Sequence, residues 1–331
     1  MAKVIIGIHG LGNKPSKELL EKWWKQSIIE GLNNVFHEDA PDFTFELVYW
    51  ADILHEKPLD EKVKDANNPL FLDEPYIKGA YKTKYIRHIK KRGILDFIRK
   101  QLSKLFLNKD LSINYAYFAD AILHRYFKDL ESYYSEKNLD ETGKPIYIKE
   151  IIRERLMQVL EYYKKDKIIL LAHSMGSIIA FDVLNQYRNE LNIDTFVTLG
   201  SPIGFPVVMG KIAEELKTKS PDLKKLTTPD LVKSKWFNFS DINDKVAINY
   251  RLADDFDKNK TGVKVIDFEV ENNYQVNENS NPHKSFGYLR TNEIAKVIFE
   301  FINGEKPVLK KRFRINIFKF LIDIKIKKRK K

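Results

Sequence analysis

The sequence predicts an α/β fold, with a mostly parallel central sheet and helices on both faces. Three observations support this prediction. Buried strand patterns alternate with amphipathic helix patterns along most of the chain, the first fifty residues form a β-α-β unit, and a strand, a tight turn and a helix follow at 168–184. Parallel strands need crossover connections, and helices supply them.

The first β-α-β unit begins with a buried strand, Lys3–Ile8, and a glycine-containing loop follows it directly. Pro15 and Ser16 are typical of a helix start. The apolar residues after them recur every three or four positions, as on one helix face, and a second strand is expected at 43–50.

Residues 54–146 lack buried strand patterns, and we expect a helical, lid-like insertion there. Helical stripes are predicted at 94–106 and 115–133. The core resumes with an amphipathic helix at 148–163. The predicted organisation is therefore a core of 1–53 and 147–304, the insertion, and a basic, apolar tail at 305–331.

The turn at the end of the strand at 168–171 carries a candidate nucleophile, Ser174. A serine nucleophile must stand clear of the backbone, and a sharp turn needs small neighbours two residues before and after it, here Ala172 and Gly176. A solvated serine that only caps a helix is the competing interpretation. The strand before the serine and the helix after it favour a nucleophile elbow.

Beyond the elbow helix, the pattern continues to alternate. Further strands are expected at 193–199, 236–239 and 263–270, with helices at 207–216 and 294–302.

A serine nucleophile needs a base, and the expected chain order is serine, acid, histidine. Six of the seven histidines precede Ser174, and only His283 follows it. The acid should lie between them at a strand end. Asp244 is favoured because it precedes Lys245-Val246-Ala247, as an acid at the start of a new turn. Asp241 is the alternative and ranks second because it lies closer to the strand and can simply cap it. Asp267 ranks third because it lies within a strand.

Acyl transfer also needs donors for the tetrahedral oxyanion. The Met175 amide, at the start of a helix, is one candidate. The other is the Leu11 amide, in a loop that His9, Gly10 and Gly12 support. A dinucleotide-binding loop is the rival interpretation, but the G-x-G-x-x-G spacing is absent, and only Asp52 is placed to bind a ribose.

Five motifs together resemble the α/β-hydrolase superfamily on its lipase and esterase side: HG-x-G, AHSMGS, TLGSP, SDINDKVA and NPHKSFGYL. The resemblance covers 2–304 except the insertion. It implies Ser174 as nucleophile, His283 as base, Asp244 as acid, and the Leu11 and Met175 amides as oxyanion hole. Ala172 stands where the family commonly has glycine. Serine at the turn argues against the dehalogenase and epoxide hydrolase branches.

The net charge of +11 is concentrated in two basic patches, 78–104 and 310–331. An anionic partner is expected, although lysine-rich faces can also simply aid solubility. The tail interleaves isoleucine and phenylalanine with cations, a composition typical of an interfacial anchor. A disordered, solvated tail and a nonspecific nucleic-acid arm are the competing interpretations, and the apolar content favours a membrane surface over nucleic acid.

The chain has no cysteine, no signal-peptide pattern and no stretch of roughly 20 apolar residues. We therefore expect a cytoplasmic protein, peripheral at the inner membrane face, without metal or cofactor. The predicted function is a serine hydrolase acting on small-molecule or lipid esters. The alternatives are an acyltransferase or thioesterase with the same triad, and a non-catalytic peripheral membrane protein on this fold.

Overall fold

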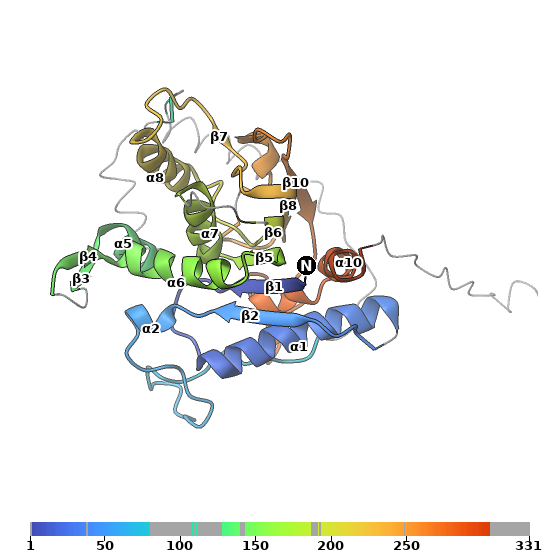
Figure 1. The fold of residues 1–331 in the computed structure, drawn as a ribbon. Coiled ribbons are helices and arrows are strands. Elements are labelled where there is room, and N and C mark those ends of the chain that lie inside the picture. Colours follow the sequence, from blue (N-terminus) through green and yellow to red (C-terminus); the bar gives the residue numbers. More distant parts are fainter. Residues whose placement is uncertain are drawn as a thin grey trace, which may run out of the picture.

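The computed structural model describes residues 2–37, 39–79, 108, 110–111, 128–139, 143–186, 191, 193–247 and 249–304. Six strands form one central sheet, in the order β10-β8-β6-β5-β1-β2, and every neighbouring pair is parallel (Figure 1). In chain order these strands are β1 (Lys3–Ile8), β2 (Thr44–Val48), β5 (Lys167–His173), β6 (Ile193–Leu199), β8 (Val232–Ser240) and β10 (Val265–Glu269). The predicted α/β class is confirmed.

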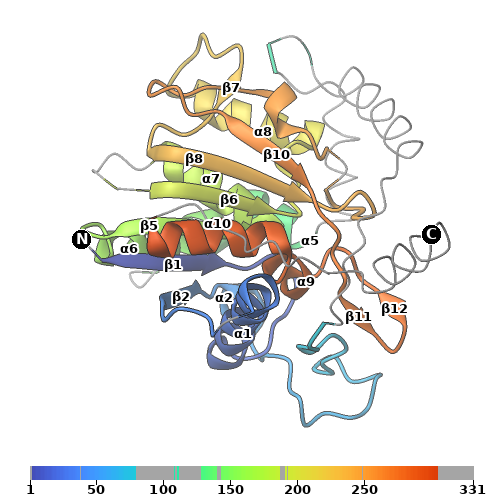
Figure 2. The same ribbon diagram turned by 90° about the vertical axis from the view of Figure 1, so that its right-hand side faces the viewer.

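Helices cover both faces of this sheet (Figure 2). One face carries α6 (Ile148–Tyr162), α7 (Met175–Gln186) and α8 (Pro206–Lys217), and the other carries α1 (Lys17–Phe36), α9 (Ser285–Leu289) and α10 (Asn292–Asn303). Because side chains alternate along a strand, Ile6 of β1 joins the apolar core under the first set, whereas Ile5 joins the core under the second. Each helical layer thus buries its own apolar cluster against the sheet.

The carboxyl ends of the central strands lie at one edge of the sheet. Ile8 pairs with Ala172, Ala172 with Thr198, and Leu199 with Phe239. The loops that follow β1, β5, β6 and β8 therefore begin side by side. In Figure 2 the short hairpin of β11 (Gln275–Val276) and β12 (Asn279–Ser280) lies at this same end. This edge is where open α/β sheets bind ligands.

Helix α1 begins where the sequence predicts. Ser16 is its N-cap and accepts a hydrogen bond from the Leu19 amide at 3.4 Å. The helix ends at His37, which has the left-handed conformation with φ of 56°. At Gly31 the helix lies close to Arg290, the C-cap residue of α9. A Cβ added to Gly31 would lie 2.9 Å from Cα of Arg290, so the approach requires glycine.

Several predicted strands have different bounds. β10, predicted at 263–270, spans Val265–Glu269. β2 ends at Val48, before the predicted 50, because the Trp50 amide donates its hydrogen bond to the His9 ring and starts α2 (Ala51–Leu54). β8 begins at Val232, earlier than predicted, since two exposed residues and Lys235 interrupt its apolar pattern. The remaining short elements are β7 (Leu226–Thr227), η1 (Leu252–Asp254) and β9 (Phe256–Asp257).

Only parts of the predicted insertion are described. They include α5 (Lys128–Ser135) and a hairpin of β3 (Lys137–Leu139) and β4 (Pro145–Tyr147). The helix expected at 94–106, most of that at 115–133, the tail at 305–331 and nearly all of both basic patches lie outside the described residues. Among the helices that are described, none is long and apolar enough to cross a membrane.

Candidate active site

Ser174 occupies the turn between β5 and α7 with a φ of 53°. This left-handed backbone is uncommon for a residue with a Cβ and marks a strained position. Close packing around the turn explains why its neighbours are small. A Cβ on Gly176 would lie 2.6 Å from the His9 carbonyl oxygen, and one on Gly10 would lie 2.6 Å from Cβ of Ser174. The loop after β1, which contains His9 and Gly10, is thus in direct contact with the turn at Ser174.

His283 contacts Ser174 from the loop between β12 and α9. Its Nε2 lies 2.9 Å from Oγ of Ser174, and its Nδ1 lies 2.8 Å from Oδ2 of Asp244. With the carboxylate as acceptor, Nδ1 carries the proton, so Nε2 accepts the hydrogen bond from the serine hydroxyl. The His283 side chain is one-quarter exposed, whereas that of Asp244 is fully buried. The structure therefore places the three predicted residues in one hydrogen-bonded chain.

The Asp244 carboxylate has its acceptor sites occupied. Oδ1 accepts hydrogen bonds from the amides of Val246 at 2.8 Å and Ala247 at 3.3 Å. Oδ2 accepts one from the Tyr288 hydroxyl at 2.7 Å, in addition to that from His283. Burial and the Asp244 charge raise the pKa of Tyr288 well above its ordinary value, so the hydroxyl remains a donor. These contacts fix the carboxylate towards the imidazole.

The two alternative acids occupy structural positions. Asp241 accepts hydrogen bonds from the amides of Asn243 and Asn272, both at 2.7 Å, and burial raises its pKa. Asp267 accepts hydrogen bonds from the Leu252 amide at 3.0 Å and from two other groups. Each carboxylate therefore holds nearby backbone in place, and only Asp244 contacts the histidine.

The His9 ring supports the glycine loop. Trp50 donates its backbone N–H to Nε2 at 3.0 Å, which leaves Nδ1 to donate to the Gly10 carbonyl oxygen at 2.8 Å. The ring also stacks on the Trp50 indole, with 4.8 Å between centroids. Burial, together with nearby Lys14, holds the pKa of His9 well below its ordinary value. His9 is therefore a neutral, fixed support of the loop.

The predicted oxyanion donors come from this loop and from α7. Lys14 Nζ donates to the Gly12 carbonyl oxygen at 2.8 Å and also to that of Leu11, which closes the loop over itself. Met175 is the first residue of α7, and the first amides of a helix have no acceptor within it. The contact of Gly10 with Ser174 brings the two elements together.

His173, which sequence reasoning did not assign to the site, joins the elbow to the histidine loop. Its Nε2 lies 2.7 Å from the His283 carbonyl oxygen and donates a hydrogen bond to it. Burial and the neighbouring His283 lower the pKa of His173 well below its ordinary value, so the ring is neutral. Its place in the sequence, directly before Ser174, was the signal that could have identified it as a site residue.

Tyr288 and Gly200 were also not predicted as site residues, although both lie in motifs quoted above. Gly200 follows β6 with a φ of 55°, and a Cβ there would lie 2.7 Å from Oδ2 of Asp244 and 3.1 Å from Nδ1 of His283. Only glycine combines this backbone with this approach. Among the described residues, no group of three or more His, Asp or Glu side chains is arranged to hold a metal ion.

Comparison with known proteins identifies one family. A family model described as "PGAP1-like alpha/beta domain" matches residues 108–297, more than half of the chain. The match contains the elbow and the later strands, with Ser174, Asp244 and His283. It does not reach the first β-α-β unit or the His9 loop. No curated protein matches the chain.

Proposed function

Because this chain belongs to the PGAP1-like alpha/beta domain family, a lipase- and esterase-like family of α/β hydrolases, we propose that it is a serine hydrolase that cleaves carboxylic esters. The family supports hydrolase chemistry in general. The observation that supports the finer proposal is the continuous hydrogen-bonded chain from Ser174 through His283 to Asp244. Small-molecule or lipid esters are the proposed substrates.

In this proposal, Oγ of Ser174 attacks the ester carbonyl carbon while Nε2 of His283 takes the hydroxyl proton. The tetrahedral intermediate collapses when the same nitrogen returns that proton to the departing alcohol, which leaves an acyl group on the serine. Water then attacks the acyl-enzyme with His283 again as base, and the second tetrahedral intermediate releases the carboxylic acid as His283 returns the proton to Oγ of Ser174. Asp244 holds the ring with Nδ1 protonated and stabilises the imidazolium in each step.

The amides of Met175 and Leu11 are the proposed oxyanion donors. Negative charge develops on the carbonyl oxygen only in the intermediate, so fixed N–H groups lower the barrier without reorganising. The start of α7 adds its dipole. The His9 support described above holds the second amide in place.

Labelling with a fluorophosphonate probe tests this function. We expect one covalent adduct on the wild-type protein, which Ser174→Ala abolishes and His283→Ala reduces by a factor of about 10³ or more. Ser220→Ala changes an exposed loop serine and should label as wild type. A folded wild-type protein without an adduct at Ser174 would contradict the proposal.

Product analysis then separates hydrolysis from transfer. With a p-nitrophenyl ester and added alcohol or thiol, a hydrolase releases mainly the free acid, whereas an acyltransferase forms a new ester or thioester. Preferential hydrolysis of acyl thioesters over the matched oxygen esters would instead support a thioesterase.

A further inference from the structure

The backbone around His283 is held by a neighbouring side chain, Asn281. Its Oδ1 accepts a hydrogen bond from the His283 amide at 3.0 Å, and its carbonyl oxygen accepts one from the Lys284 amide at 3.2 Å. Because Oδ1 of Asn281 faces the His283 amide, the Nδ2 group on the other side of the carboxamide is left to donate to another segment. The loop conformation therefore depends on what this donor contacts.

Nδ2 of Asn281 contacts Glu74, a residue more than two hundred positions earlier in the chain. Asn281 donates to Oε1 of Glu74 at 2.6 Å, and Nζ of Lys284 donates to Oε2 at 2.9 Å. One carboxylate thus bridges Asn281 and Lys284, which lie on either side of His283 in the loop. Its side chain is 30% exposed, and that of Lys284 is 25% exposed, so the pair is partly shielded from water.

Glu74 carries its charge at neutral pH. Partial burial by itself would raise its pKa, but the Lys284 ammonium and the hydrogen bonds from Lys284 and Asn281 outweigh burial, and the pKa lies below its usual value. The carboxylate is therefore a strong acceptor for both donors.

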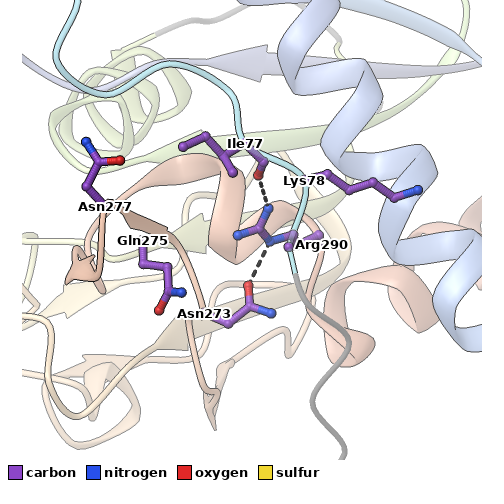
Figure 3. A pocket seen from close by; sticks show the side chains of 7 residues that line it. Ile77, Lys78, Asn273, Gln275, Asn277 and Arg290 are labelled. Carbon is purple, nitrogen blue, oxygen red and sulfur yellow. Dashed lines mark hydrogen bonds between the residues drawn. The ribbon is translucent and has the colours of Figure 1, made fainter.

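The backbone that carries Glu74 is itself fixed. Tyr274 donates its hydroxyl to the Pro75 carbonyl oxygen at 2.6 Å, and Arg290 donates Nη1 to that of Ile77 at 2.6 Å and Nε to Oδ1 of Asn273 at 2.7 Å. Figure 3 shows the buried Arg290 guanidinium between these two partners, beside a pocket.

Glu30 of α1 holds the end of the same segment. Its Oε1 accepts from the Gly79 amide at 2.8 Å, and its Oε2 accepts from the Tyr76 hydroxyl at 3.0 Å. Glu74 therefore projects from an anchored segment, 74–79, and its carboxylate has a defined place.

We infer that Glu74 is a positioning residue that holds the His283 loop in register with Ser174. This inference rests on the proposed function. The residue lies in the first part of the predicted insertion, outside the family match, so the insertion contributes to the geometry of the proposed catalytic histidine. A shift of a general base by about 1 Å can lower a rate by about 10², which makes such a contact measurable.

Two substitutions at Glu74 distinguish the effect of side-chain length from the effect of the negative charge. Glu74→Asp keeps the charge but is shorter by one carbon, roughly 1.5 Å, and cannot span both donors. We expect it to lower kcat for p-nitrophenyl butyrate and the fluorophosphonate labelling rate by about tenfold, with KM within twofold of wild type. Glu74→Gln keeps an oxygen for Asn281, and its rates should stay within about threefold.

Tyr76→Phe is the matched control, because it removes one hydrogen bond of the same segment but leaves those at Pro75, Ile77 and Gly79, and it does not touch the contacts of Glu74 with the histidine loop. Its rates should stay within twofold of wild type. Thermal unfolding of all variants checks that each is folded. Asn281→Asp tests the contact from the other side, since it keeps the acceptor for the His283 amide but opposes a carboxylate to Glu74, and a tenfold loss is again expected.

Wild-type rates in Glu74→Asp or Asn281→Asp would overturn the inference. So would an equal loss in Glu74→Gln and Glu74→Asp, or a loss in Tyr76→Phe as large as that in Glu74→Asp. Failure of the proposed function is distinct, because the wild-type protein itself would then not be labelled at Ser174.

Discussion

At the scale of single residues, Gly200 shows how one backbone position supports the candidate triad. Its amide donates to the Phe239 carbonyl oxygen at 2.9 Å, which holds the turn after β6 against β8. The missing side chain leaves the space that Asp244, His283 and Tyr288 occupy. A residue with no reactive group is therefore as closely fitted to the site as the residues that have one.

Gly200→Ala should lower the fluorophosphonate labelling rate by about a hundredfold. The new Cβ would displace Asp244 or His283, and the left-handed backbone adds about 1 kcal/mol of strain. Gly262→Ala is the matched control, because Gly262 also has a positive φ, 87°, but no atom lies within 4 Å of its added Cβ. Wild-type labelling by Gly200→Ala would show that the turn adapts.

At the scale of elements, a buried ionic cluster joins the helices on one face. Nη2 of Arg153, on α6, lies 2.6 Å from Oδ2 of Asp182, on α7, and Nη1 lies 2.6 Å from Oε1 of Glu215, on α8. The Tyr133 hydroxyl of α5 donates to Asp182 at 2.7 Å. Burial would raise the pKa of Glu215, but Arg153 outweighs it and lowers that pKa to about 2. One guanidinium thus connects four helices.

Arg153→Met should lower the free energy of unfolding by about 3–5 kcal/mol, because it leaves the Asp182 carboxylate buried without its counter-charge. Urea denaturation measures this loss. Adding Asp182→Asn should recover part of it, since a neutral amide needs no counter-charge. Glu150→Gln, which changes an exposed partner of Arg153, should have little effect. A loss below 1 kcal/mol in Arg153→Met would contradict this account.

Local periodicity predicted the elements whose buried residues are contiguous. β1, α1 and α6 each bury an apolar run or stripe, so their positions followed from the sequence. β8 was predicted too short because its first half alternates with exposed polar residues. The β11–β12 hairpin has only two residues in each strand and was missed.

The candidate site was predictable where chain order constrains it. His283 followed from its being the only histidine after Ser174. Asp244 and Asp241 both follow a strand, and Asp244 was favoured because it stands at the start of a new turn. Of the partners that orient these residues, His173 carried a sequence signal, because it directly precedes Ser174. Glu74 and Tyr288 were not predictable as partners, because they reach the site through contacts between distant segments. No local pattern records such pairings.

At the scale of the whole molecule, positive charge is concentrated outside the described core. The last described residue, Gly304, ends α10 in the left-handed conformation and donates its amide to the Glu300 carbonyl oxygen. A chain that stops there keeps this cap, so the basic tail at 305–331 can be removed without cutting α10.

Removal of the tail should weaken binding to anionic vesicles. Each Lys or Arg near an anionic leaflet contributes about 1 kcal/mol, so we expect the full chain to sediment with phosphatidylserine-containing vesicles and to dissociate at high salt. The chain ending at Gly304 keeps the basic patch at 78–104 and should sediment less than the full chain. Pure phosphatidylcholine vesicles are the control. Equal sedimentation of both chains would show that the tail is not an anchor.

Two buried neutral histidines make the stability of the whole fold depend on pH. The pKa values of His9 and His173 are lowered, chiefly by burial. In the unfolded chain a histidine binds a proton near pH 6.5. Below that pH the unfolded state therefore holds more protons than the folded state, and the free energy of unfolding falls as the pH falls, by at most about 1.4 kcal/mol per pH unit for each histidine.

We therefore expect urea denaturation midpoints to fall between pH 7.5 and pH 5.5, a window above the range in which most unfolded carboxylates titrate. His173→Gln should lower stability at pH 7.5 but make its decline with acidity shallower, because one of the two sites is gone. His37→Asn, at an exposed helix end that tolerates the left-handed conformation, should keep the wild-type slope. A midpoint independent of pH across this window would mean that the two rings accept protons without leaving their buried positions.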